Sequence, residues 1–370
     1  MLTTLMMGLA TSLSLALALI LGVPAPAGAQ QASTAPAAGQ PWRFLVSGDS
    51  RNCGNVVMPA IAVTAKTTQA AFYWHLGDLR YAMDYDEDMV NAPEYKARPM
   101  SNLSYLQAAW PDFIEHQIKP FGTLPFYVGI GNHEIIYPRT RADFIQQFAD
   151  WLVTPQLREQ RMKDDPTDFM AKTYYRWIQG GVAFYNLDNA GADMFDARQL
   201  RWLQVRLEKD MADASVKSIV IGVHAALPDS LAIDHSMSDF PQGVESGRAV
   251  YRMLLKARDV GKKNVYVLAS HLHLYMAGVY NSAYWRANGG VLPGWIAGSA
   301  GAHRVKLPAG AAEATEAKSP TYGSILGTVK PDGSIAFEYK EVVEADVPVE
   351  VVTRYGRDFV HYCFAENVDK

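Results

Sequence analysis

The stretch AFYWHLGDLRY (residues 71–81) joins an apolar, aromatic run to a polar loop. The run 71–77 is short and rich in aromatic residues, which predicts a buried β-strand. Asp78 follows directly at the end of this strand, and Arg80 and Tyr81 come close behind it. An aspartate after a strand often only caps a turn. Whether Asp78 does more depends on how the other strands of the chain end.

Other apolar runs of the chain end in polar residues that can bind metals. Four expected strands are followed by such residues, namely 43–48 by Asp49, 124–130 by Asn132, 218–223 by His224 and 264–270 by His271. Helical spacing lies between them, at 56–70, 104–121, 197–211 and 247–258. Strands that alternate with helices predict an α/β layered fold, in which functional groups gather beyond the carboxyl ends of the strands.

The remaining segments are expected to be mostly strands. Residues 173–189 read as two strands joined at Gly180 and Gly181. The C-terminal part is strand-like, with a hairpin turn signal at Pro331-Asp332-Gly333. Of the histidines that fall outside the strand-end pattern, His75, His116 and His361 are expected to have structural roles, whereas His303 could border a site or not.

Composition sets broad limits on the class of protein. The chain has 370 residues, of which 49% are hydrophobic and 19% charged, so it can bury a large core. Its net charge of -4 provides no basic face, which argues against nucleic acid as a partner.

The N-terminal segment predicts export. The first charged residue is Arg43, and the apolar run 5–23 precedes the small residues Ala27-Gly28-Ala29. This pattern predicts a signal peptide over 1–29, a flexible linker over 30–41 and one domain over 42–370, in a secreted or periplasmic protein without stable membrane insertion after cleavage. No Lys or Arg precedes the run, so an uncleaved membrane anchor is the alternative.

The chain contains two cysteines, Cys53 and Cys363. In an exported protein they could pair and tie the two ends of the domain together. Two unpaired cysteines are an equally good interpretation, because spacing alone does not decide between them.

The polar residues at the strand ends predict a metal centre. Their donors are carboxylates, an amide oxygen and imidazoles, which suit hard to borderline ions, while cysteine-rich zinc knuckles are absent from the sequence. The set consists of Asp49, Asp78, Asn132, His224, His271 and His273. Because so many donors exceed the needs of one tetrahedral ion, we expect two ions that share Asp78, an arrangement suited to phosphoryl hydrolysis.

Five motifs at these strand ends carry a family resemblance. GDS (48–50), GDLRY (77–81), GNHE (131–134), VH (223–224) and SHLH (270–273) occur in this order. Together they resemble the calcineurin-like metallophosphoesterases. The resemblance implies a four-layer α/β/β/α sandwich with two central mixed sheets, and a catalytic domain over 42–370.

Two departures from the common family pattern point to one branch. Arg51 stands where the pattern Asp-x-His has its histidine, and Tyr81 stands three positions after Asp78. The purple acid phosphatase branch likewise lacks that histidine and has a tyrosine at this spacing. Ser270 also replaces the glycine that usually precedes the family's last His-x-His pair. For Tyr81, packing against the core is the alternative to metal binding.

The resemblance implies how two ions would be held. One ion would be bound by Asp49, Asp78, Tyr81 and His273, and the other by Asp78, Asn132, His224 and His271. A tyrosinate ligand favours Fe(III), and the second ion could be Fe, Zn or Mn.

The resemblance also implies substrate contacts. His133 would stabilise the phosphate or protonate the leaving oxygen, with Glu134 orienting its ring. His235 would contact the substrate. Arg51 and Arg80 could meet phosphate oxygens, with ion pairs outside the site as the alternative.

The expected function is hydrolysis of a small-molecule phosphate monoester by metal-activated water. A phosphodiesterase that acts on nucleotides or phospholipid head groups is the enzymatic alternative, because the same ions serve both reactions. A non-catalytic binding protein on a phosphatase scaffold is the other, and it is suggested by Arg51 and Ser270.

Overall fold

The computed structural model describes residues 39–191, 194–233 and 235–369. The predicted signal peptide (1–29) and residues 30–38 of the predicted linker lie outside this range. No helix in the described part of the chain combines the length and the apolar composition needed to cross a bilayer.

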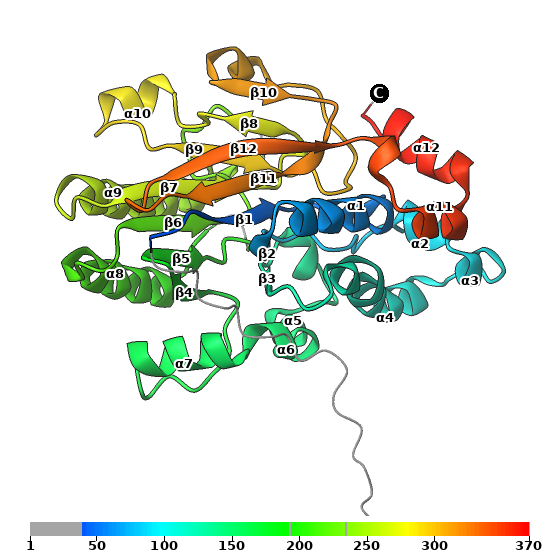
Figure 1. The fold of residues 1–370 in the computed structure, drawn as a ribbon, viewed down its shortest axis with the longest axis horizontal. Coiled ribbons are helices and arrows are strands. Elements are labelled where there is room, and N and C mark those ends of the chain that lie inside the picture. The colour runs from blue at the N-terminus through cyan, green and yellow to red at the C-terminus, as the bar shows by residue number, and fades with distance from the viewer. Residues whose placement is uncertain (1–38, 192–193, 234, 370) are drawn as a thin grey trace, which may run out of the picture.

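The first sheet has five strands in the order β12-β11-β1-β2-β3. Their bounds are β1 Trp42–Ser47, β2 Ala70–His75, β3 Phe126–Val128, β11 Tyr322–Val329 and β12 Ile335–Val342. β1, β2 and β3 are parallel, whereas β11 is antiparallel to β1 and forms the expected hairpin with β12. Figure 1 shows this hairpin in orange beside the dark blue β1.

The second sheet has seven strands in the order β10-β8-β9-β7-β6-β5-β4. Their bounds are β4 Tyr175–Gln179, β5 Val182–Asn186, β6 Ser218–Gly222, β7 Asn264–Ala269, β8 Tyr275–Ala277, β9 Gly294–Ala297 and β10 Glu316–Lys318. β5, β6, β7 and β9 are parallel, and the other three strands pair antiparallel to their neighbours. Both sheets are therefore mixed, as expected.

Aromatic side chains pack the two sheets face to face. The ring of Phe72 on β2 lies 5.2 Å from that of Phe184 on β5, and Trp74 on β2 lies 5.1 Å from Trp177 on β4. Trp74 also donates a hydrogen bond of 2.9 Å across the interface to Asn186. A Cβ atom on Gly222 of β6 would stand 2.1 Å from the Trp74 ring, so only glycine fits there.

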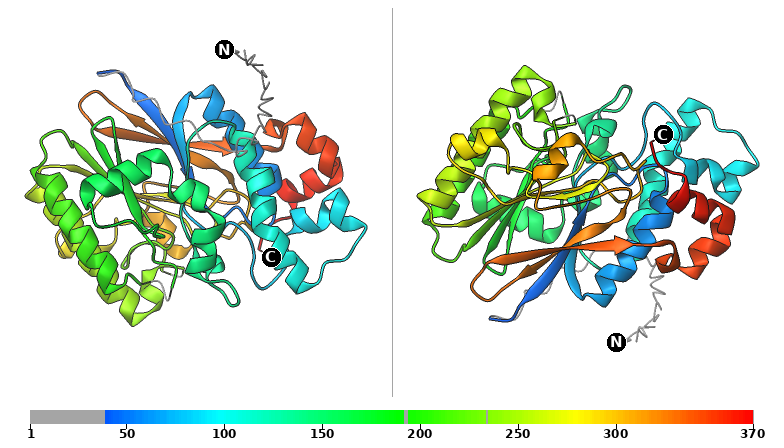
Figure 2. Two further views of the ribbon diagram at one scale, coloured as in Figure 1. Left: turned by 90° about the horizontal axis from the view of Figure 1, so that it is seen from below. Right: turned by 90° about the horizontal axis from the view of Figure 1, so that it is seen from above.

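Helices cover the outer faces of the two sheets. The α-helices are α1 Gly54–Thr67, α2 Glu87–Asn91, α3 Pro93–Lys96, α4 Asn102–Phe113, α5 Arg141–Gln147, α6 Ala149–Leu152, α7 Pro155–Asp164, α8 Ala197–Ala212, α9 Pro241–Asp259, α10 Ala283–Ala287, α11 Val349–Tyr355 and α12 Arg357–Ala365. Short π and 3-10 turns are η1 Ile114–Ile118, η2 Lys119–Phe121, η3 Asn132–Glu134, η4 Met237–Asp239, η5 Ala309–Glu313 and η6 Glu344–Asp346. α1 packs on the first sheet, while α8 and α9 pack on the second. Figure 2 shows these two groups at opposite sides of the sheets, which confirms the expected α/β/β/α layers.

The packed sheets bring the carboxyl ends of their parallel strands together. After β1, the Gly48 amide donates to the Ala297 carbonyl at the end of β9, at 2.9 Å. After β2, the Leu76 carbonyl accepts from the Ser270 hydroxyl, which follows β7, at 3.2 Å. We call this junction of strand ends the seam.

The C-terminal segment differs from the sequence-based expectation. Its strands end at β12, and residues 349–365 form α11 and α12 instead of strands. The reason is visible in the spacing of its buried residues Val351, Tyr355, Phe359 and Cys363, which recur every four positions. These helices lie beside α1 (Figure 1), where Cys363 forms a disulfide with Cys53.

Arg80 does not lie in the seam, which corrects its predicted contact with phosphate. Its guanidinium is fully buried and donates to Asp88 at 2.7 Å and to Asn55 at 2.5 Å. It also pairs with Asp112, and Asp86 lies 3.5 Å away. Burial opposes its charge, but Asp88, Asp112 and then Asp86 hold the pKa of Arg80 well above its usual value. Arg80 therefore anchors α2 and α4 to α1.

Replacement of Arg80 should destabilise the fold. In Arg80→Met, the buried carboxylates of Asp88 and Asp112 lose their counter-ion, and we expect the free energy of unfolding to fall by about 3–5 kcal/mol. Urea denaturation would measure this change. The exposed Arg98 offers a matched control, because Arg98→Met should change stability by less than about 0.5 kcal/mol. Equal losses in the two variants would refute the anchoring role.

Removal of the disulfide should also destabilise the chain. The bond links residues separated by 310 positions, so the double variant Cys53→Ala/Cys363→Ala should lose about 2–5 kcal/mol of stability. Urea denaturation with and without a phosphine reductant provides the measurement. The reductant should weaken the wild type and leave the double variant unchanged; an unaffected wild type would contradict the bond.

Candidate metal centre

The seam holds the predicted ligands that follow five different strands. Asp49, Asp78 and Asn132 follow β1, β2 and β3 of the first sheet, and His224 and His271 follow β6 and β7 of the second. Asp49 and Asp78 are completely buried. Residues distant in the sequence therefore meet because the two sheets pack with their strand ends at one edge.

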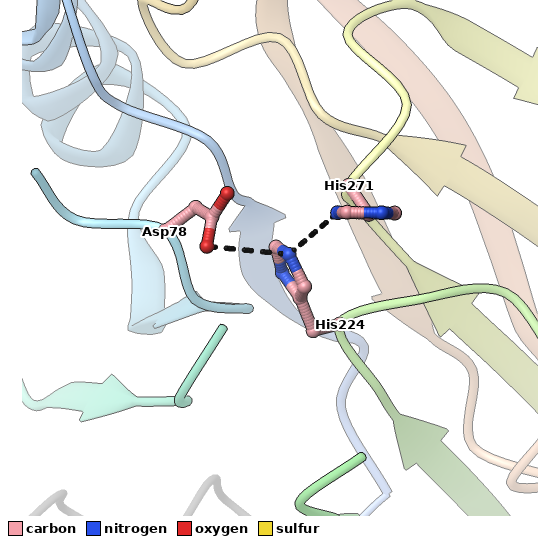
Figure 3. Close-up of side chains that lie close together, drawn as sticks. All are labelled: Asp78, His224 and His271. Atoms are coloured by element: carbon pink, nitrogen blue, oxygen red, sulfur yellow. Dashed lines mark hydrogen bonds and ion pairs between the residues drawn. The ribbon is translucent and has the colours of Figure 1, made fainter. Parts of the chain in front are cut away.

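Four donor atoms converge on one point of the seam. His224 Nε2 lies 2.9 Å from His271 Nδ1, 3.0 Å from Asn132 Oδ1 and 3.3 Å from Asp78 Oδ1. Figure 3 shows the rings of His224 and His271 and the carboxylate of Asp78 facing one another. We call these four side chains the second donor set.

The tautomer of His224 leaves its lone pair inside this set. Its Nδ1 lies 3.1 Å from the Leu76 carbonyl, which can only accept, so Nδ1 carries the ring proton. A metal-binding histidine typically uses its other nitrogen in this way. In the neutral ring, Nε2 then presents a lone pair toward the Asn132 and Asp78 oxygens and toward His271 Nδ1. Donor atoms gathered in this way fit a metal ion.

The pKa values show how the set balances charge without an ion. Burial opposes a charged His224, but Asp78, followed by Asp49, raises the pKa of this imidazole to about 9. Burial, aided by the charge of His224, lowers the pKa of His271 to about 3. One proton on His224 can therefore hold the set together, and a bound metal would displace it.

Three of the predicted ligands have an unusual backbone conformation. The φ angles of Asp49 and Asp78 are 58° and that of His271 is 68°, in the left-handed region that non-glycine residues rarely adopt. Such conformations cost about 1–3 kcal/mol each and are concentrated at functional sites. The Asp49 carboxylate also accepts the His271 amide at 2.6 Å, which links the two loops.

The other predicted ligands surround the side chain of Arg51. We call Asp49, Asp78, Tyr81 and His273 the first donor set. Arg51 Nη2 lies 2.6 Å from His273 Nε2, and Arg51 Nε lies 3.5 Å from Asp78 Oδ2. The guanidinium carbon stands 4.6 Å from the centre of the Tyr81 ring. With a cationic side chain among them, these residues do not fit a second metal ion in this arrangement.

His133 also contacts Arg51. Its Nε2 lies 2.6 Å from Arg51 Nη1 and must accept, because a guanidinium only donates. The ring proton of neutral His133 is therefore on Nδ1, which has no hydrogen-bond partner in the described part of the chain. Burial lowers the pKa of His133 to about 4, so the ring is neutral at physiological pH.

Glu134 supports the loops and does not orient the His133 ring as expected. Its buried carboxylate accepts the backbone amides of Asp78 at 2.9 Å, Leu79 at 3.0 Å and Gly131 at 2.8 Å. This carboxylate joins the loop after β2 to the loop after β3. The spacing within GNHE marks the residue but does not indicate these backbone partners.

The remaining predicted residues lie at the edge of the seam. His235 is exposed, and its ring lies 5.4 Å from that of His271, so it borders the second donor set. The ring of His303 bonds Glu87 at 3.2 Å, while its carbonyl accepts from His273 Nδ1 at 2.7 Å. The Ser270 hydroxyl lies 3.1 Å from His224 Nδ1.

Sequence reasoning missed two supports of this site. Asn189 accepts the His224 amide at 3.1 Å and donates to the Ala225 carbonyl at 2.7 Å. The His303 carbonyl fixes the tautomer of His273. A backbone carbonyl leaves no signature in the sequence. Asn189 ends the expected strand pair, and a polar residue at this position is only a weak sign of a role near the site.

Comparisons with known proteins identify the fold. No protein-family model matches the chain, and a search of curated proteins found no match. A purple acid phosphatase from seeds of yellow lupin (Lupinus luteus) is similar in structure, with a TM-score of 0.51 and 16% identity over 83% of this chain and 53% of that one. A structure of PhoD gives a TM-score of 0.52 and 14% identity over 84% of this chain and 73% of that one. This chain thus spans about half the length of the lupin enzyme. Together with the two mixed sheets and their flanking helices, these similarities show that the chain has the calcineurin-like metallophosphoesterase fold.

Proposed function

We propose that this chain is a metal-dependent hydrolase of small-molecule phosphate monoesters, of the acid phosphatase type. The observation that carries the proposal is the second donor set, whose four donor atoms converge at the seam. The structural similarity to a purple acid phosphatase and the position of Tyr81 after Asp78 support the same reaction class.

The donor chemistry suits a borderline divalent ion. Two imidazoles, one amide oxygen and one carboxylate match Zn, Mn or Fe(II) better than Ca or Mg. A divalent ion bound there would supply Lewis-acid activation of a phosphoryl oxygen and of an attacking water.

Side chains of the seam would bind the substrate. The guanidinium of Arg51 lies beside the second donor set and can donate to phosphate oxygens. The buried Nδ1 of His133 has no hydrogen-bond partner among the described residues, and we assign it the bond to the leaving oxygen. His235 stands at the exposed rim, where the organic part of a substrate would lie.

The Fe(III) ion that the resemblance implies is not included in this proposal. It would require a Tyr81 phenolate within the first donor set. Burial raises the pKa of this phenol, although the charge of Arg51 opposes that effect. The prediction of two ions stays a prediction, which the metal stoichiometry of the purified chain tests.

The disulfide supports the proposed secreted or periplasmic location. Disulfides such as that of Cys53 and Cys363 persist in oxidising compartments.

The proposal is tested by aryl phosphate hydrolysis. Protein loaded with Zn, Mn or Fe(II) should hydrolyse an aryl phosphate monoester. Asp78→Asn should lower kcat/KM by more than about 100-fold, because losing even an outer-shell partner of a metal site costs about 10- to 100-fold. His361→Ala is the control, since this exposed histidine on α12 pairs with Glu344 and should leave the rate unchanged.

A bis-aryl phosphodiester separates the alternatives. A monoesterase should show at least about tenfold higher kcat/KM on the monoester, a difference of about 1.4 kcal/mol in transition-state binding. Faster hydrolysis of the diester would favour the phosphodiesterase. No hydrolysis of either ester with any of the three ions would favour a binding protein.

A further inference from the structure

The guanidinium of Arg51 lies where the first metal ion of the implied pair would be held. Arg51 is 5% exposed, so it belongs to the interior of the seam. Three residues of the first donor set contact it, with His273 at 2.6 Å, Asp78 at 3.5 Å and the Tyr81 ring at 4.6 Å. Arg51 thus occupies the space between these donors.

Arg51 also uses the lone pair that an ion would need. His273 Nδ1 donates to the His303 carbonyl at 2.7 Å, so its Nε2 presents a lone pair. Arg51 Nη2 lies 2.6 Å from this atom and donates to it. His133 Nε2 accepts from the other terminal nitrogen in the same way. The lone pair of His273 that would bind the ion therefore already accepts a hydrogen bond from Arg51.

The carboxylates and the aromatic ring around Arg51 also support its place in the first donor set. Asp49 Oδ1 and Asp78 Oδ2 have no hydrogen-bond partner within the described residues, and both need a nearby positive charge. Arg51 supplies it, since its Nε lies 3.5 Å from Asp78 Oδ2. The Tyr81 ring meets the guanidinium as a cation–π partner.

The second donor set has a different character. The donor atoms of Asn132, His271 and Asp78 lie 2.9–3.3 Å from His224 Nε2, and Asp78, His224 and His271 form a group that could hold a metal ion. One set therefore already contains a guanidinium, while the donor atoms of the other set face one another and fit a metal ion.

We propose that Arg51 takes the place of the first metal ion and that the chain binds one metal ion, in the second donor set. The fixed charge of the guanidinium would neutralise Asp49 and Asp78 and offer donors to the phosphate. This inference rests on the metal-binding part of the proposed function and not on its catalytic part.

Metal stoichiometry of the purified full chain tests the inference. After equilibration with Zn²⁺ or Mn²⁺ and gel filtration, elemental analysis should find about one ion per chain. His271→Ala should lose that ion, whereas His273→Ala and Tyr81→Phe should keep it, because they alter only the first donor set. Two ions in the wild type, or loss of the ion in His273→Ala, would overturn the inference and leave the proposed function standing. No bound ion would overturn both.

Substitution of Arg51 tests the replacement directly. Arg51→Gly should open the first donor set and raise the count from one ion to two, while Arg51→Lys, which keeps the charge, should stay at one. Loaded with Fe(III), Arg51→Gly should show a tyrosinate-to-iron absorption band that the wild type lacks. Arg51→His provides a second variant if the glycine variant does not fold by circular dichroism. A coloured wild type, or a folded Arg51→Gly or Arg51→His with one ion, would refute the replacement.

Discussion

Two buried carboxylates at the seam determine how the site is built. Asp49 and Asp78 are completely removed from solvent, and a buried charge is tolerated only when opposite charge and hydrogen bonds compensate for lost hydration. Burial would raise the pKa of Asp49, yet the neighbouring His273 and His224 side chains lower it to about 2. Both carboxylates thus stay ionised, and positive charge must gather on either side of them.

The fold positions these carboxylates through the aromatic packing between the two sheets. Trp74 and Phe72 on β2 pack against rings of the second sheet, only a few residues before Asp78. This packing places the end of β2 against the ends of β6 and β7, so that Asp78 meets His224. Glu134 then holds the adjoining loops through three backbone amides. The core therefore determines the geometry of the site, and the polar loops complete it.

Two buried arginines, Arg51 and Arg80, illustrate how the surrounding carboxylates assign a role. Arg51 and Arg80 both follow an aspartate of a strand-end motif, and both are buried among carboxylates. Arg80 is enclosed by Asp88 and Asp112 from the segment after Tyr81, so it ties that segment to α1. Arg51 faces Asp78 and the histidines of the seam. The same chemical requirement, a counter-charge for a buried carboxylate, gives one residue a structural role and the other a place in the site.

The layered fold, the strand ends and the residue types that meet there can be predicted from the sequence. Apolar periodicity and turn residues act locally, so β1, β2, β6 and β7 could be located without a structure, and the order of the motifs was enough to indicate a metal site. The expectation of strands is wrong over α11 and α12, and spacing alone does not decide whether Cys53 pairs with Cys363. Which cation each carboxylate receives depends on how the chain folds. A guanidinium on a long side chain can reach several partners, and its partner is selected by burial and by distances between loops that are far apart in the chain.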